Sequence, residues 1–351
     1  MTHEDRLPGL SRHPHVRLGH HPTPIDFLPR LGETLGLSLW AKRDDCNGLA
    51  FGGNKVRQLE YYLGPAVAQN ADTVLITGAL QSNFVRTTVA AANTLGMKSE
   101  VQLEERVPDT DALYRNSGNI LLDQLLGATI HYFAEGENEA AADAELDRHA
   151  ERLRGEGRKP YVIHLGIDHP PYGGLGYASC AAECLKQFDN GTGERPDVVV
   201  IPSGSALTHA GFLAGARACG WDVPVMGVCV RRDAGQQRVR VQRRATEILD
   251  LLGSEYSLRS EDVSVSDAVL APGYGRMNPQ VAEAVTMAAR HEALLLDPVY
   301  TGRTMAGLID FVRTGEIRPG SKVLFIHTGG GPALFAYQNK MATEIEALTA
   351  L

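Results

Sequence analysis

The residues best suited to covalent chemistry lie in the stretch Ala50–Arg57, whose sequence is AFGGNKVR. Lys55 follows two glycines where a helix is predicted to begin, because Val56, Leu59 and Leu63 share one helical face. The positive end of the helix dipole disfavours an ammonium group and so favours the neutral amine of Lys55. Such an amine forms a Schiff base with a carbonyl compound, and the glycines leave room for a flat ring. The plain alternative is a surface lysine after a glycine turn.

Small and hydroxyl residues form a predicted strand-to-helix turn, made of Ser203, Gly204, Ser205, Ala206, Leu207 and Thr208. Backbone N–H groups, hydroxyl donors and a helix N-terminus at such a turn form a cradle for an anion. The turn lacks the Gly-Lys-Ser/Thr end of a Walker loop and the Gly-x-Gly-x-x-Gly pattern of dinucleotide sites. It therefore suits one isolated phosphate, and the alternative is an ordinary capping turn.

Three other predicted turns carry polar residues, at Gln81–Asn83, Asp297–Arg303 and Ile326–Gly331. Ser82 or Asn83 suits an N-cap of the following helix. The amide of Asn83 is equally suited to bond a ring hydroxyl, with Ser82 beside a reacting carbon. Taken singly, each segment is an ordinary turn. Because ligands of open α/β sheets bind outside the carboxyl ends of strands, these turns together with Lys55 and the phosphate turn predict a site for pyridoxal 5′-phosphate.

The elements that must position these residues alternate between strands and helices. Strands are predicted at Leu37–Lys42, Thr73–Thr77, Ser99–Leu103, Tyr161–Leu165, Asp197–Pro202, Val225–Val230, Ala293–Leu296 and Lys322–His327. The helix that begins near Lys55 should end or kink at Gly64–Pro65. Further helices are predicted at Val85–Leu95, Asn119–Leu126, Glu139–Leu153 and Tyr177–Phe188. The alternation predicts an α/β fold with doubly wound, mostly parallel sheets.

The composition narrows the class of protein. A chain of 351 residues suggests two domains. The formal net charge of −8 and the lack of a basic stripe argue against a nucleic-acid partner. No apolar run approaches the roughly 20 residues of a membrane span, so we expect no membrane partner. The segment Met1–Arg12 is polar and has no apolar signal core, which favours a cytoplasmic protein.

No metal site and no disulfide framework are predicted. The five cysteines are scattered, and a cytoplasmic chain with such spacing does not suggest disulfides. Cys180 and Cys184 lie four residues apart on a predicted helix, and we expect them to be small buried residues. Four histidines cluster in a Pro-rich segment that we expect to be a surface arm: His13, His15, His20 and His21.

The chain resembles the pyridoxal-phosphate enzymes of the tryptophan synthase β type. Within them it is similar to the branch that holds D-cysteine desulfhydrase, L-cysteate sulfo-lyase and 1-aminocyclopropane-1-carboxylate (ACC) deaminase. The matching stretches span nearly the whole chain in the family's order: Pro22–Pro24, Lys42–Cys46, Gly52–Lys55, Gln81–Asn83, Gly173–Tyr177, Asp297–Tyr300 and His327–Gly330. The resemblance implies two doubly wound domains with the cofactor in the cleft between them, and a homodimer. Residues 1–57 and 173–351 would form a large cofactor-binding domain, and residues 58–172 a small α/β domain.

The resemblance also implies roles for single residues. Lys55 would hold the cofactor covalently, and Asn83 would bond the ring oxygen of the cofactor. Because Lys55 would then be released beside the substrate α-carbon, we expect it to serve as the base for the α-proton. The turn Ser203–Thr208 would hold the phosphate. Ser82 and Tyr300 would line the substrate side of the site. Candidates for an anionic substituent on the substrate, such as a sulfonate, are Arg86, Arg106 and His169, although such residues are more often solvated or salt-bridged.

Two threonines bear on the choice of reaction. In the branch, the residue after the Asp-Pro-Val-Tyr tyrosine meets the pyridine nitrogen, and it is Glu in the cyclopropane deaminase but Thr301 here. The deaminase tends to have a leucine where this chain has Thr328. A neutral hydroxyl leaves the ring a weaker electron sink, enough for β-elimination of a good leaving group. We therefore expect α,β-elimination of a small amino acid such as D-cysteine or L-cysteate to pyruvate and ammonia.

Other positions do not favour β-elimination. The segments Lys42–Phe51 and Tyr172–Gly176 are closer to the deaminase, and Phe84 and the loop Gly166–Tyr172 depart from the branch. Ring-opening deamination is therefore the second hypothesis. A cofactor-binding protein without activity is the third, although the intact Lys55 argues against it.

Overall fold

Two separate sheets organise the chain, for which the computed structural model describes residues 6–108, 110–191 and 194–349. Part of the polar segment Met1–Arg12 therefore lies outside the described residues. The larger sheet has, in spatial order, β1 (Ile25–Phe27), β2 (Ser38–Arg43), β10 (Lys322–His327), β7 (Val198–Ser203), β8 (Val225–Cys229) and β9 (Ser264–Ser266). The smaller has β5 (Thr129–Phe133), β4 (Lys98–Glu104), β3 (Thr73–Ala79) and β6 (Pro160–Ile163).

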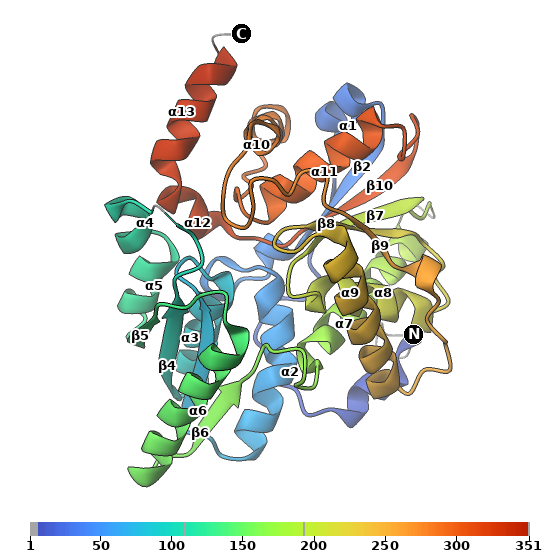
Figure 1. Ribbon diagram of the computed structural model, residues 1–351. Helices are drawn as coiled ribbons and strands as arrows, with labels where there is room; N and C mark the ends of the chain where they lie inside the picture. Colours follow the sequence, from blue (N-terminus) through green and yellow to red (C-terminus); the bar gives the residue numbers. More distant parts are fainter. Residues whose placement is uncertain (1–5, 109, 192–193, 350–351) are drawn as a thin grey trace.

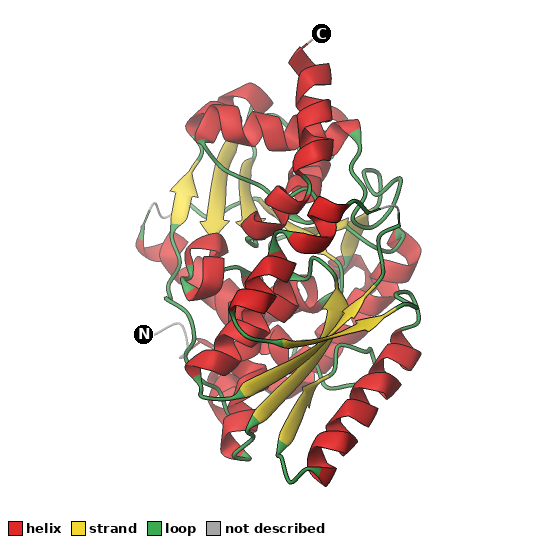
Figure 2. Ribbon diagram, turned by 90° about the vertical axis from the view of Figure 1, so that its left-hand side faces the viewer, coloured by secondary structure: helices red, strands yellow, loops and turns green. Residues whose placement is uncertain are grey.

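All neighbouring strands pair in parallel except β1 with β2. The predicted α/β fold with mostly parallel sheets is therefore confirmed. Parallel pairs need long crossovers, which helices supply here on both faces of the sheets (Figure 2). The helices are α1 (Pro29–Leu35), α2 (Asn54–Ala68), α3 (Asn83–Thr94), α4 (Ala112–Asn116), α5 (Asn119–Leu125), α6 (Glu139–Gly155), α7 (Tyr172–Asn190), α8 (Leu207–Ala218), α9 (Ala234–Leu252), α10 (Pro279–Glu292), α11 (Thr301–Arg313), α12 (Gly331–Ala336) and α13 (Gln338–Thr349).

Strand β7 shows why the larger sheet is covered on both faces. All six of its residues are buried, and the first four alternate between two apolar clusters. Val199 and Ile201 pack in the cluster that contains residues of α7, α8 and α9, whereas Val198 and Val200 pack in the cluster that contains residues of α10 and α11. Figure 1 shows these two groups of helices on opposite faces of the sheet.

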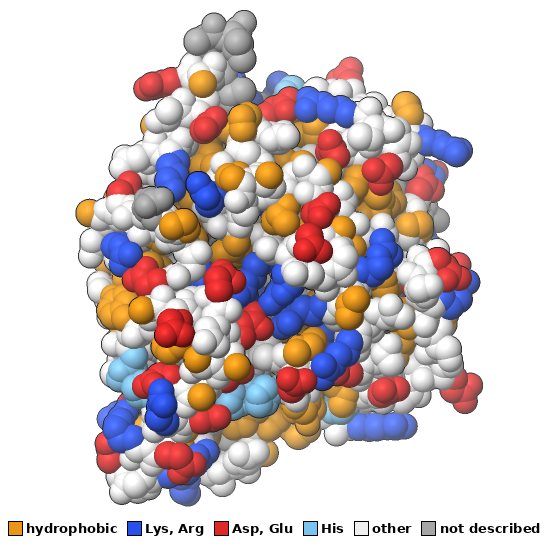
Figure 3. Space-filling model, in the orientation of Figure 1, with side chains coloured by type: hydrophobic (Ala, Val, Ile, Leu, Met, Phe, Trp, Pro, Cys, Tyr) orange, Lys and Arg blue, Asp and Glu red, His pale blue; other side chains and the backbone are white. Residues whose placement is uncertain are grey.

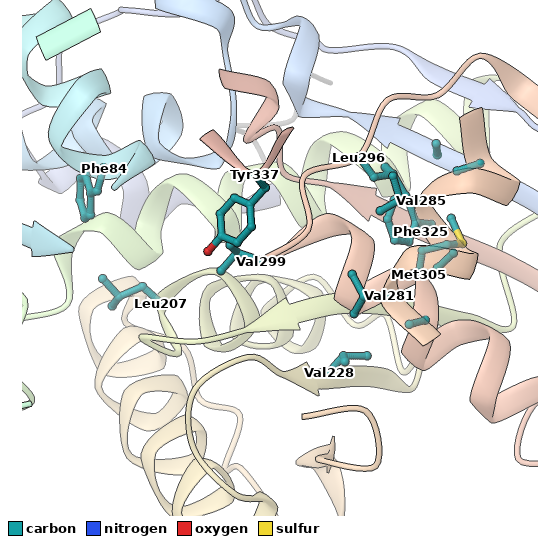
Figure 4. Close-up of a cluster of buried hydrophobic side chains, with 14 of the residues drawn as sticks. Phe84, Leu207, Val228, Val281, Val285, Leu296, Val299, Met305, Phe325 and Tyr337 are labelled. Carbon is teal, nitrogen blue, oxygen red and sulfur yellow. The ribbon is translucent and has the colours of Figure 1, made fainter. Parts of the chain in front are cut away.

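One apolar cluster reaches both sheets. It contains Val74 and Val101 of the smaller sheet as well as Val200 and Phe325 of the larger one. Figure 4 shows part of this cluster, with Phe84 of α3 near Leu207 of α8 at one end and Val285, Met305 and Phe325 at the other. Burial of apolar surface therefore holds the two sheets together. All four strands of the smaller sheet fall within residues 58–172, the range predicted for the small domain.

Two predicted elements differ in the structure. Helix α2 continues through Pro65 to Ala68, and the buried side chains of Leu63 and Ala66 on either side stabilise it there. The predicted strand Ala293–Leu296 is not a strand, because Ala293 takes a left-handed conformation (φ 52°) that ends α10, and no described strand pairs with the segment. Among the described residues, no helix is both long and apolar enough to cross a membrane.

Candidate active site

A cleft lies where the carboxyl ends of strands from both sheets meet. It holds about 1120 Å³ of space not filled by atoms, part of it open to solvent. Its wall includes residues at or just after the ends of β3, β4, β7, β8 and β10, namely Ala79, Glu104, Gly204, Val230 and Thr328. Loops at the carboxyl ends of parallel strands are where ligands of such sheets bind. The cleft gathers Lys55, Ser82, Asn83, Gly204, Ser205, Ala206, Thr208, Tyr300 and Thr328 of the predicted site.

Lys55 lies in the first turn of α2, as predicted, and its amine faces the cleft. Nζ donates to Oε1 of Gln58 at 3.2 Å and lies 4.6 Å from the ring centre of Phe84. Burial disfavours the ammonium and lowers the pKa of Lys55 from 10.5 to about 7. The start of the helix is fixed by Asn47, whose side chain accepts from the Gly53 N–H and donates to the Gly53 carbonyl. At neutral pH a large share of this amine is therefore free for attack on an aldehyde.

A chain of amide groups connects Lys55 to the turn after β7. Gln58, which accepts from Lys55, donates through Nε2 to Oγ1 of Thr208 at 2.8 Å, and Nδ2 of Asn54 donates to the same oxygen at 2.8 Å. Because the hydroxyl of Thr208 already accepts two hydrogen bonds, its own proton is available to a further acceptor. A phosphate on the turn would be such an acceptor.

The turn after β7 has the features of an anion cradle. Ala206 adopts a left-handed conformation (φ 77°) and precedes α8, so the N-terminal N–H groups of that helix follow directly. A Cβ on Gly204 would lie 2.9 Å from a methyl group of Val230, so only glycine fits there without a shift. These donors fit the predicted phosphate.

Two residues of this predicted turn do not line the cleft. The hydroxyl of Ser203 is buried and pairs with Nδ1 of His209 at 3.1 Å and with Nε2 of Gln237 at 2.8 Å. The side chain of Leu207 packs in the apolar core. Ser203 and Leu207 therefore contribute backbone to the turn rather than a side chain to the cleft.

Asn83 is held with its oxygen turned away from the cleft. Its Oδ1 accepts from Nη1 of Arg86 at 3.2 Å and from Nδ2 of Asn119 at 3.0 Å. The two amide protons of Asn83 are thus left to face the cleft, which fits a bond to the ring oxygen of the cofactor. Arg86 is 1% exposed and also donates to the Gly52 carbonyl. It is therefore committed to positioning, and the prediction that it binds a substrate anion is wrong.

Replacing Arg86 by methionine should loosen Asn83 and weaken cofactor binding. One oriented hydrogen bond contributes about 0.5–1.5 kcal/mol, so we expect a roughly tenfold rise in the dissociation constant of pyridoxal phosphate. Titration of the cofactor-free protein, followed by absorbance, measures it. The matched control is Arg115→Met, which breaks an exposed pair with Glu105, and an equal effect of both substitutions would contradict the role of Arg86.

Tyr300 and Ser82 both line the cleft. The Tyr300 hydroxyl lies 2.9 Å from the hydroxyl of Tyr274, and burial raises the pKa of Tyr300 well above 10. Ser82 caps α3, where its Oγ accepts from the Val85 N–H. Its hydroxyl proton remains available to a ligand in the cleft.

Thr301 lies in a different place from the one predicted. Its side chain is fully buried, donates through Oγ1 to Oδ1 of Asp297 at 2.7 Å and accepts from the Asp297 N–H at 2.9 Å. Thr301 is absent from the described lining of the cleft, so in this arrangement its hydroxyl does not face a cofactor ring. Thr328 does line the cleft, and its carbonyl accepts from the Asn54 N–H at the start of α2.

Arginines beside the phosphate turn were not singled out from the sequence. Arg232 donates to the Gly204 carbonyl and Arg240 to the Ser205 carbonyl, while Glu139 of α6 pairs with Arg231 and Arg232 at 2.7 and 2.6 Å. Figure 3 shows basic side chains gathered near the middle of this face, between the regions of α6 and α9. Charged residues directly after the buried strand β8 were the available sequence signal. The predicted Arg106 also lines the cleft but pairs with Glu104, whereas His169 is not among its lining residues.

Comparison with known proteins agrees with this geometry. Residues 16–329 match the family described as pyridoxal-phosphate dependent enzymes. D-cysteine desulfhydrase of Salmonella paratyphi C (strain RKS4594) is 40% identical over 329 residues, or 93% of this chain and 97% of the relative. ACC deaminase of Burkholderia cenocepacia is 41% identical over 331 residues, with the same coverage. The crystal structure of an ACC deaminase homologue has a TM-score of 0.85 and 33% identity, covering 98% of this chain and 100% of that chain. The chain therefore belongs to the family of pyridoxal-phosphate dependent enzymes.

Proposed function

We propose that the protein is a lyase that carries out α,β-elimination on a small amino acid of the D-cysteine or L-cysteate type. The products would be pyruvate, ammonia and the released β-substituent. The observation that carries this proposal is the neutral hydroxyl residue Thr328 on the cleft wall, against the start of the helix that holds Lys55. A cytoplasmic homodimer, with residues 1–57 and 173–351 as the large domain and 58–172 as the small one, is part of the same proposal.

When bound, the cofactor supplies a carbonyl for the substrate amine and a conjugated ring that withdraws electrons from the substrate α-carbon. Lys55 would hold the cofactor covalently, and its Nζ, once free, would accept the α-proton of the substrate, for which a pKa near 7 is well matched. Asn83 would donate to the ring oxygen, and the N–H groups of the phosphate turn with the Thr208 hydroxyl would hold the phosphate. Ser82 and Tyr300 donate to the substrate carboxylate or to the departing group.

The placement of the two threonines gives a matched pair of substitutions. Thr328→Val should lower kcat by about tenfold. A hydroxyl that contacts the cofactor ring contributes roughly 1.4 kcal/mol when negative charge from the substrate α-carbon spreads over that ring. Thr301→Val should instead lower stability by about 1–3 kcal/mol, because it removes the hydroxyl bond to the buried Asp297 carboxylate and leaves the Asp297 N–H without its acceptor. Steady-state kinetics and urea denaturation of both variants separate the two effects. A loss of kcat confined to Thr301→Val would restore the role first predicted for Thr301.

A panel of substrates tests the proposed reaction. The cofactor-loaded protein is incubated with D-cysteine, L-cysteate, β-chloroalanine and ACC, and keto acid and ammonia are measured. We expect pyruvate from at least one of the first three and no 2-oxobutyrate from ACC. Turnover of ACC at a comparable rate would favour the deaminase hypothesis. If none is turned over while Lys55→Ala still binds the cofactor, the protein is a cofactor-binding protein.

A further inference from the structure

Two histidines and an aspartate form a compact cluster beside the cleft, outside the residues assigned above. Asp143 of α6 and His164 and His169 after β6 each offer a ligand atom, and these atoms all lie within 4.8 Å of one another. The rings of His164 and His169 stack with centres 4.0 Å apart and planes 7° apart. Asp147, one turn further along α6, has a carboxylate oxygen 3.4 Å from Nε2 of His164. Three potential ligands thus come together from two chain segments, and Asp147 lies at the other ring nitrogen of His164.

The hydrogen bonding of the cluster is incomplete. Nδ1 of His164 is buried, has no hydrogen-bond partner among the described atoms and lies 3.6 Å from Oδ1 of Asp143. Zinc-class ions bind imidazole nitrogen and carboxylate oxygen at about 2.0–2.2 Å, so two ligand atoms of one ion lie at most about 4.2 Å apart. The three ligand atoms all lie within 4.8 Å of one another, so they can share an ion once one imidazole ring turns out of the stack and its lone pair points at the same place as the other.

A second cluster of similar composition provides a comparison within the chain. Glu100, His131 and His149 are also close enough to share an ion. There, however, Nη2 of Arg152 donates to the Glu100 carboxylate at 2.6 Å and so already balances its charge. No guanidinium within 4.0 Å of Asp143 is found in the described part of the chain, so its carboxylate is open to a cation.

The backbone around the Asp143 cluster is held in place. Arg244 of α9 donates to the carbonyls of Gly166 and His169 at 2.6 and 2.7 Å. A Cβ on Gly166 would lie 2.7 Å from Oδ2 of Asp143, so the absence of a side chain at Gly166 leaves room for the carboxylate beside this loop. Asp143 and Gly166 both line the cleft. In Figure 3, histidine side chains lie just below the basic group near the middle of the face.

We propose that Asp143, His164 and His169 form a binding site for a divalent transition metal ion of the zinc class. The bound ion joins α6, which follows the smaller sheet's β5, to the loop that leads into α7. Because both segments line the cleft, the ion fixes one side of its entrance and lowers turnover.

Binding is tested on the cofactor-loaded, full-length protein carrying Cys46→Ser, which removes an exposed thiol. Zinc affinity is measured by calorimetry, and cobalt is used as a probe whose visible absorption reports tetrahedral coordination. We expect one ion per chain, and at least a tenfold loss of affinity in His169→Gln and in Asp143→Asn. His131→Gln, in the comparison cluster, should bind as the parent does. No binding to the parent, or equal binding to all variants, would overturn the site.

The effect on turnover needs a substrate without a thiol, because cysteine and sulfide themselves bind zinc. With β-chloroalanine, inhibition should saturate at the zinc concentration that saturates binding, and it should be lost in His169→Gln. If zinc binds without inhibiting turnover, the proposed effect of the ion on the cleft entrance is wrong, whereas the metal site itself stands. If no substrate were turned over at all, the proposed elimination would fail, and the calorimetric result would stand independently.

Discussion

Alanine in place of Lys55 should abolish turnover, with an expected loss of about 10⁴-fold. The change removes the covalent attachment of the cofactor together with the base for the α-proton, and a positioned base alone contributes about 10²–10⁴-fold. The measurement is pyruvate formation from β-chloroalanine at saturating cofactor. Borohydride treatment followed by mass spectrometry should place one cofactor adduct on Lys55 in the parent and none in the variant. An adduct on another lysine would contradict the assignment.

Lys55, which is needed for turnover, should also lower the stability of the cofactor-free protein. The pKa of Lys55 is lowered in the fold to about 7, so the unfolded chain binds more protons between about pH 7 and 10.5, and stability rises with pH in that window. Lys55→Met should therefore stabilise the cofactor-free protein by about 2–3 kcal/mol at pH 7, allowing for partial exposure to the cleft. The gain should disappear above about pH 10.5. Urea denaturation at several pH values measures it, and a gain independent of pH would point to packing instead.

Glu183→Ala should be the most destabilising single change in the ion-pair network behind the site, with an expected loss of about 3–5 kcal/mol. The Glu183 carboxylate is buried and accepts from Nζ of Lys42 at 2.5 Å and from the guanidinium of Arg57 at 2.9 Å. Asp44, also fully buried, binds the other side of Arg57 at 2.9 Å. Removing Glu183 leaves two buried cations with only one carboxylate between them. The shift in the urea midpoint measures the loss.

An exposed pair provides the control for Glu183. Glu283→Ala breaks a pair with Arg313, whose side chain is 56% exposed, and should cost less than about 1 kcal/mol. Burial alone would raise the pKa of Glu183, but Arg57 and Lys42 outweigh it and hold the pKa well below 4.5. Its contribution is therefore full above pH 4.5 and is lost as the pH falls further. Equal effects of the two substitutions would contradict the importance of the buried network.

The sequence predicted the parts of the molecule that depend on local pattern. Strands such as Asp197–Pro202 were found because a strand buried on both faces is almost continuously apolar. The cleft residues at strand ends were found because parallel strands share one carboxyl edge. The helix through Pro65 was missed because tertiary burial of its neighbours outweighs one lost hydrogen bond.

The side-chain partners inside the site could not be predicted from the sequence. Thr301 was expected to meet the pyridine ring of the cofactor. Its hydroxyl instead donates to Asp297, four residues earlier, and this local contact depends on the conformation of the turn. Arg86 was one of three candidates for a substrate anion, and it instead orients Asn83 from within the core. The signal for Gln58 was present, since it lies three residues after Lys55 on the same helical face. The cluster around Asp143 joins segments some twenty residues apart, and no spacing rule reveals it.

The buried network beneath the site also sets an order of events during synthesis. Arg57 and Lys42 emerge from the ribosome well over a hundred residues before Glu183, their shared counter-ion. Until α7 has been made and packed, burying those two cations is unfavourable. The amino-terminal segment that holds Lys55 therefore completes its folding only when the middle of the chain has been made. The protein acquires its reactive amine only after roughly half of it has been translated.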